Sequence, residues 1–182
     1  MARLALDLFR GLRALHKLPN ADGEMLEFAA LLHDIGFYIA QSKHHKHGQY
    51  LIENSDLGGF SGEEITLLAL LVRYHRKATP KDAHNPFGGL SEAQKRRVRL
   101  LAGLLRVADG LDRTCQGLVR GLRCRISDRE VEIVLSTQGQ DLELELWSAR
   151  RKADLLQETL GRKLRFVVEE LKDDGDDPEQ HA

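Results

Sequence analysis

The sequence has little cysteine, no excess of either charge and no long apolar run. Of its 182 residues only Cys115 and Cys124 are cysteines, and neither lies in a CxxC arrangement, which excludes a disulfide framework and a zinc knuckle. No apolar run approaches the roughly 18 residues that cross a bilayer, and charges interrupt the N-terminal stretch MARLALDLFRGLR, which argues against a signal peptide. We therefore expect a cytoplasmic protein without a membrane span.

The formal charge of −1 gives the whole chain no general attraction for nucleic acid. With 42% apolar and 30% charged residues, the composition is that of an ordinary globular protein. The charge is unevenly spread, however, and a basic middle region can attract phosphates even when the chain as a whole is neutral. The basic tracts are 43–47, 73–77, 95–99 and 120–125.

Up to about residue 116, apolar residues recur with a helical period. Leucines spaced by three or four residues predict a first helix, which a break at Pro19 and Gly23 ends, and a second helix over about 24–35. Two later helices begin with a serine followed three residues on by Glu or Gln, which is the capping-box pattern. The pairs are Ser61 with Glu64 and Ser91 with Gln94.

After about residue 117 the apolar period changes from 3.6 to 2, which is typical of strands. We expect a small α+β unit of four strands and one helix, and a disordered tail without apolar residues. The fold class is therefore mainly α, with a helical bundle over 1–116, the α+β unit over 117–170 and an acidic tail over 171–182. The expected strands are 117–127, 129–136, 141–147 and 164–169, and the expected helix is 149–163, ending near Gly161.

The stretch AALLHDIG, residues 29–36, places His33 and Asp34 at the end of an apolar run. An unpaired buried charge costs several kcal/mol, so either local hydrogen bonds satisfy this pair or the pair holds a ligand. His47 and His75 also stand beside apolar helical stretches, and Asp109 interrupts the apolar run LLRVADGLD.

Imidazole and carboxylate together suit divalent first-row metals and, with more oxygen ligands, magnesium or manganese. His33, Asp34 and Asp109 could hold one ion, and His47 and His75 a second ion or a phosphate. Such an ion makes phosphate-ester hydrolysis the natural chemistry. The structural alternatives are a buried hydrogen-bonded cluster for His33, Asp34 and Asp109, and a solvent-facing or helix-capping position for His47 and His75. His44 and His45 belong to a short basic tract and are expected to be exposed.

The order of these groups resembles the HD superfamily of metal-dependent phosphohydrolases. The phrases AALLHDIGFYI, HHKHGQYLIENSDLGGFSGEE, LVRYHRK and LLRVADGLDR are similar to the C-terminal region of the exopolyphosphatase/guanosine pentaphosphate phosphatase (Ppx/GppA) family, and residues down to LGRKLRFVVE resemble its last small domain. The resemblance covers residues 1 to about 170. It implies an HD-type bundle that binds a divalent metal (Mn, Mg, Fe, Ni or Zn).

The chain departs from that family in two respects. The family hydrolyses its substrates in N-terminal actin-like domains with glycine-rich phosphate loops, and nothing here corresponds to them. The first histidine of the HD pattern would also fall a few residues before Met1, and His16 lies at the wrong end of its helix to replace it. Either the site is one ligand short, or Met1 is an internal or alternative start and the encoded protein extends upstream; the second is our hypothesis.

Several cations could serve an anionic substrate. Lys46, Arg73, Arg76 and Lys77 could steer it to the site, and Arg113 could bind phosphate by a bidentate contact or pair with a neighbouring aspartate. On helices such charges are often only the solvated face.

Our leading hypothesis is a metal-dependent phosphohydrolase of a phosphorylated small molecule, nucleotide or polyphosphate, with Asp34 as the group that activates water. The alternative is a non-catalytic module that binds polyphosphate, a guanosine alarmone or a partner protein. Expected partners also include a second copy of the chain in a homodimer and a separately encoded N-terminal half of the Ppx/GppA type.

Overall fold

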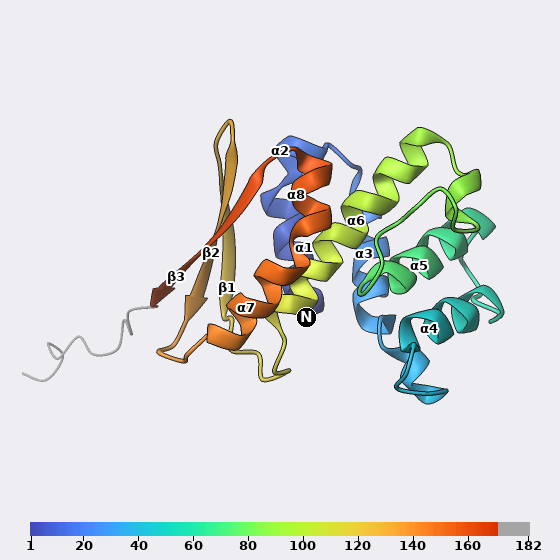
Figure 1. Ribbon diagram of the computed structural model, residues 1–182, viewed down its shortest axis with the longest axis horizontal. Coiled ribbons are helices and arrows are strands. Elements are labelled where there is room, and N and C mark those ends of the chain that lie inside the picture. Colours follow the sequence, from blue (N-terminus) through green and yellow to red (C-terminus); the bar gives the residue numbers. More distant parts are fainter. Residues whose placement is uncertain (171–182) are drawn as a thin grey trace, which may run out of the picture.

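Helices occupy the first two thirds of the chain in the computed structural model, which describes residues 1–170, and a sheet with two helices follows (Figure 1). This confirms a mainly α fold followed by a small α+β unit. The predicted acidic tail lies outside the described residues, and the division into two domains at residue 116 stays a prediction. The elements are α1 (Ala2–Gly11), α2 (Arg13–His16), α3 (Asn20–Leu32), η1 (Ile35–Tyr38), α4 (His44–Glu53), α5 (Gly62–Tyr74), η2 (Phe87–Gly89), α6 (Glu92–Leu111), β1 (Gly121–Ile126), β2 (Glu130–Thr137), α7 (Glu143–Lys152), α8 (Asp154–Leu160) and β3 (Lys163–Glu170).

Helix α6 is at the centre of the molecule and contacts α1, α3, α5, α7 and α8. In Figure 1, α7 and α8 lie between α6 and the sheet, and α5 lies on the opposite side of α6. From Leu100 to Ala108 it is buried at every position, which is typical of a helix surrounded by others. Gly110 lets α7 approach closely, because a Cβ atom there would lie 2.6 Å from the Cα atom of Ala149. The C-terminal end of α6 is thereby fixed against α7.

The sheet has the order β1-β2-β3, with β1 antiparallel and β3 parallel to β2. The parallel pair needs a crossover, and α7 and α8 provide it while packing on α6. Val131, Ile133 and Leu135 of β2 are fully buried, as their alternation predicted.

Residues 141–147 were predicted as a strand, and this is wrong, because α7 begins at Glu143. Leu144 and Trp147 are more than half exposed, whereas Glu145 and Ser148 are buried. The carboxylate of Glu145 accepts hydrogen bonds from the backbone N–H and hydroxyl of Thr114. The described unit therefore has three strands and two helices instead of four strands and one helix.

The second helix also begins earlier than predicted, at Asn20 instead of residue 24, and Gly23 lies inside it. A Cβ atom on Gly23 would lie 3.1 Å from the ring of Phe9, so this glycine serves the packing of α3 on α1 and does not end a helix. No helix within residues 1–170 combines the length and apolar composition that crossing a bilayer requires.

Both predicted capping boxes are confirmed: the Ser61 and Ser91 hydroxyls accept from the backbone N–H groups of Glu64 and Gln94.

We expect Ser91→Ala to lower the free energy of unfolding by about 1 kcal/mol, since it leaves the N-terminus of the long central helix uncapped. Urea denaturation measures this. Ser55→Ala is the control, because that exposed hydroxyl bonds only to the Leu51 carbonyl and should change stability by less than about 0.5 kcal/mol. Equal effects of the two changes would contradict the prediction.

Candidate functional site

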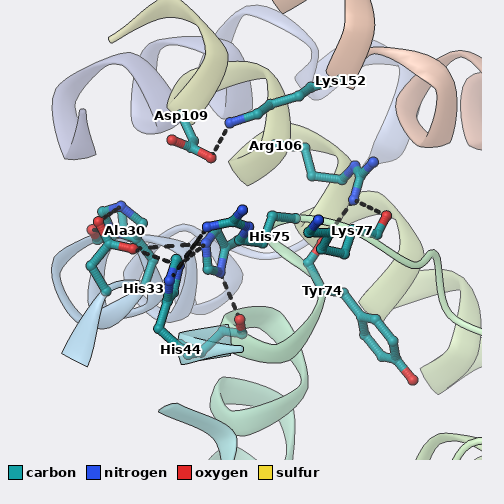
Figure 2. A network of polar contacts seen from close by, with 12 residues as sticks. Ala30, His33, His44, Tyr74, His75, Lys77, Arg106, Asp109 and Lys152 are labelled. Atoms are coloured by element: carbon teal, nitrogen blue, oxygen red, sulfur yellow. Dashed lines mark hydrogen bonds and ion pairs between the residues drawn. The ribbon is translucent and has the colours of Figure 1, made fainter. Parts of the chain in front are cut away.

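Three helix ends bring a carboxylate and two imidazoles together (Figure 2). Asp34 follows the C-terminus of α3, His44 begins α4 and His75 is the C-cap of α5. Asp34 Oδ1 lies 3.1 Å from His44 Nε2 and 3.8 Å from His75 Nε2, and the two Nε2 atoms are 3.3 Å apart. One atom from each of the three residues therefore lies within 4.8 Å of the other two.

The backbone fixes which ring nitrogen carries the proton. In His33, His44 and His75, Nδ1 lies against the carbonyl oxygen of the residue three positions earlier, and because a carbonyl only accepts, Nδ1 must donate. A neutral His44 or His75 therefore presents its Nε2 lone pair to the cluster, whereas His33 Nε2 donates to Asp34 Oδ2 at 3.1 Å. Two such lone pairs at 3.3 Å repel each other unless a cation or proton lies between them, and the Arg76 guanidinium is 3.2 Å from the Nε2 of His44. The carbonyls belong to Ala30, Gln41 and Val72, at 2.8, 3.1 and 2.7 Å respectively.

The pKa shifts favour a neutral His75 beside an ionised Asp34, and a charged His33 in contact with Asp34. Burial lowers the pKa of His75 to about 3. Burial acts against ionisation of Asp34, but its hydrogen bond to His33 and the nearby imidazoles outweigh this and lower its pKa. Burial likewise acts against a charged His33, and its hydrogen bond to Asp34 and the charge of Asp34 outweigh that and raise its pKa. Neutral imidazole and carboxylate are the forms that bind metals, so the donor set fits a divalent first-row ion.

A cavity of about 410 Å³, here called the site cavity, opens on this cluster. Phe37 and Trp147 line it along with Asp109, which forms an ion pair with Lys152 of α7 (Figure 2). Six cations surround it, so the cavity suits an anionic ligand beside the cluster. They are Arg76, Lys77, Arg106, Arg113, Arg151 and Lys152.

Arg106, on α6, is only 5% exposed and ties three elements together at this cavity. Its Nη1 donates to the carbonyls of Tyr74 and Lys77 at 3.3 Å, and its Nη2 lies 3.3 Å from Asp154 Oδ1 (Figure 2). It thereby holds the turn after His75 against α6 and α8. Arg106 was not among the predicted site residues, although an arginine within the apolar run LLAGLLRVAD could have indicated it.

The structure brings together some of the predicted site residues but not all of them. His33, Asp34 and His75 meet, with His33 Nε2 at 3.1 Å from Asp34 Oδ2 on the edge of the cluster. Asp109 lines the same cavity but is engaged by Lys152. His47 is half-buried and does not belong to the three-residue group, in which His44 stands instead.

The expected exposure of His44 and His45 is wrong, since they are 2% and 8% exposed. The sequence could have indicated the burial of His44, because His44, Gly48 and Ile52 recur every four residues and form the buried face of α4. Among the predicted phosphate-binding cations, the site cavity includes Arg76, Lys77 and Arg113, whereas Lys46 and Arg73 line a neighbouring pocket. A further histidine upstream of Met1 stays a prediction.

Comparison with known proteins gives a consistent result. The model of a family described as "Ppx/GppA phosphatase, domain III" matches residues 1–161. A guanosine-5'-triphosphate,3'-diphosphate pyrophosphatase of Pseudoalteromonas translucida is 31% identical over 90 residues, 50% of this chain and 17% of that protein. A protein of the same name from Aeromonas hydrophila is 32% identical over 57% of this chain and 21% of its own length. Another from Vibrio atlanticus is 36% identical over 48% of this chain and 18% of its own length. The chain thus spans about a fifth of these curated relatives.

Proposed function

This chain belongs to the Ppx/GppA phosphatase family, and we propose that it is a metal-dependent phosphohydrolase of the HD type that acts on a phosphorylated nucleotide or oligophosphate. One observation carries the proposal: Asp34 Oδ1 and the Nε2 atoms of His44 and His75 converge, each imidazole with its Nδ1 already bonded to a carbonyl. The Arg76 guanidinium lies 3.2 Å from His44 Nε2, whereas within residues 1–170 His75 Nε2 faces only His44 and Asp34.

Asp34, His44 and His75 would hold the ion, and two nitrogen donors favour Mn, Fe, Ni or Zn over Mg. When bound, such an ion polarises a phosphoryl oxygen and lowers the pKa of water. His33 orients Asp34 through its 3.1 Å contact to Oδ2. The ionised Asp34 carboxylate is also our candidate for accepting the proton of an attacking water.

The substrate proposal rests on the cations of the site cavity and on the printed name of the relatives, which act on a guanosine phosphate. Arg76, Lys77 and Arg113 line that cavity and would neutralise phosphoryl oxygens, which guanidinium groups can do through two parallel hydrogen bonds.

A non-catalytic phosphate-binding module is the second candidate. It is favoured by the ion pair of Asp109 with Lys152, which occupies a carboxylate that would otherwise complete the ligand set. A homodimer and a complex with a separately encoded N-terminal half also remain proposals, as does a cytoplasmic location.

The test is metal content together with turnover in untagged protein. After dialysis against manganese we expect about one bound ion per chain, and hydrolysis of a nucleotide or oligophosphate that EDTA abolishes and manganese restores. Inductively coupled plasma mass spectrometry and phosphate release measure the two quantities. Bound metal without release of phosphate from any substrate tested would favour the module, and the absence of bound metal would overturn the assignment of the cluster.

A further inference from the structure

A second cavity, here called the basic pocket, lies between the N-terminus of α4 and the C-terminus of α5 and has a volume of about 630 Å³. Among the described residues 1–170, no aspartate or glutamate lines it. Its lining includes five lysine and arginine side chains, of which Arg76 and Lys77 also line the site cavity. The other three are Lys43, Lys46 and Arg73.

These five cations are not neutralised by the protein. Within residues 1–170 none of them has an acidic oxygen within 4.0 Å. In the site cavity, by contrast, Arg106 and Lys152 are paired with Asp154 and Asp109. Like charges gathered around one hollow repel each other, and a bound polyvalent anion would remove that repulsion.

The backbone adds further positive potential. Helix α4 has ten residues, no acidic residue in its first turn and no side-chain cap, because its N-cap is Lys43. The Lys46 N–H donates to the Lys43 carbonyl, but the N–H groups of His44 and His45 have no partner within residues 1–170 and can bind an anion. The helix dipole favours negative charge there.

A buried polar side chain on the same wall also lacks a partner. His45 lines the basic pocket and is 8% exposed, and its Nδ1 has no hydrogen-bond partner within residues 1–170. Buried polar atoms are nearly always bonded, so a missing partner points to a ligand or water that belongs there.

We propose that the basic pocket is a second anion site, which binds phosphoryl groups of an oligophosphate chain through Lys43, Lys46 and Arg73. A single carboxylate would leave most of the charge uncompensated, whereas an oligophosphate carries about one negative charge on each of its closely spaced groups. Arg76 and Lys77 line both cavities. When an oligophosphate chain longer than the basic pocket is bound there, its next phosphoryl groups therefore lie beside Asp34, His44 and His75. The pocket itself needs no metal.

The test is calorimetric titration of the full chain with sodium tripolyphosphate in EDTA, so that the metal cluster plays no part. We expect binding, and we expect the double variant Lys46→Gln/Arg73→Gln to weaken it at least 10-fold while leaving manganese content unchanged. The control is Arg13→Gln/Lys163→Gln, which removes the same charge from two exposed positions outside the pocket and should alter affinity less than 2-fold. Melting curves verify that both variants fold.

Absence of tripolyphosphate binding, or equal loss in the two double variants, would overturn the proposal, because the first leaves no site and the second only a general charge effect. A parallel titration with guanosine triphosphate identifies the source of the phosphates. Equal affinity with the same loss in Lys46→Gln/Arg73→Gln supports recognition of the phosphate chain alone, and tighter binding with that loss supports a nucleotide. Failure of the metal test would leave this result unaffected.

Discussion

Removing His44 is expected to lower the affinity for Mn²⁺ at least about 100-fold, while removing His47 is expected to leave it unchanged. Losing an outer-shell partner already costs 10–100-fold in metal affinity, and His44 stands in the cluster itself, 3.1 Å from Asp34 and 3.3 Å from His75. His47 lies one turn further along α4, outside the group of converging donors. Titration of metal-free protein with Mn²⁺ measures both affinities.

His44→Gln is the preferred change, because the ring of His44 packs against that of Phe37, with 4.0 Å between centroids and a tilt of 31°, and truncation to alanine would leave a cavity. His47→Gln is the matched control, and far-UV circular dichroism compares the folding of the two variants. If His47→Gln lost the metal and His44→Gln kept it, the cluster described here would be the wrong one.

The helical part of the fold could be predicted because its signals are local. Ser61 with Glu64 and Ser91 with Gln94 lie three residues apart, and both boxes form as the sequence indicated. The strand at 130–137 buries Val131, Ile133 and Leu135 as its alternating sequence predicted, and Val134 on its other face is buried as well.

The segment 141–147 could not be predicted in this way. Its leucines stand at every second position, which is typical of a strand, but contacts with distant residues stabilise a helix from Glu143 onward. Helix α7 lies against the glycine of α6 at position 110, and only a helix presents Glu145, Ser148 and Ala149 together on that side. The carboxylate of Glu145 finds its partner in Thr114, which is 31 residues away. A short stretch of sequence around 141–147 does not include Gly110 or Thr114, so it cannot indicate either contact.

The candidate site was predicted in part for the same reason. The doublet at 33–34 and His75 stand at helix ends and were selected by their apolar neighbours. Choosing between His44 and His47 depended on which face of α4 is buried. The repeat of His44, Gly48 and Ile52 indicated that face, and the packing of α4 on α5 and η1 determines it. Likewise, the cations of tracts 43–47 and 73–77 were expected to steer an anionic substrate to the same site, but α4 and α5 place Lys46 and Arg73 on a separate pocket.

Gly36→Ala is expected to lower the free energy of unfolding by about 2 kcal/mol and to weaken Mn²⁺ binding at least about 100-fold, although Gly36 cannot itself bind metal. A Cβ atom at this position would fall on the carbonyl oxygen of His44 and 2.6 Å from the backbone nitrogen of Gly48. Both neighbours are backbone atoms, so no side-chain rotation can relieve the overlap. The chain must move η1 away from α4.

That movement separates the two halves of the site, because Asp34 immediately precedes η1 and His44 begins α4. The separation of 3.1 Å between Asp34 Oδ1 and His44 Nε2 cannot survive it. Gly58→Ala is the control, since a Cβ atom there would meet no atom within 4 Å, and it should alter neither quantity. Urea denaturation and Mn²⁺ titration of the two variants check the prediction. A Gly36→Ala protein that is destabilised but keeps its metal affinity would show that the contact of η1 with α4 supports the fold without positioning the ligands.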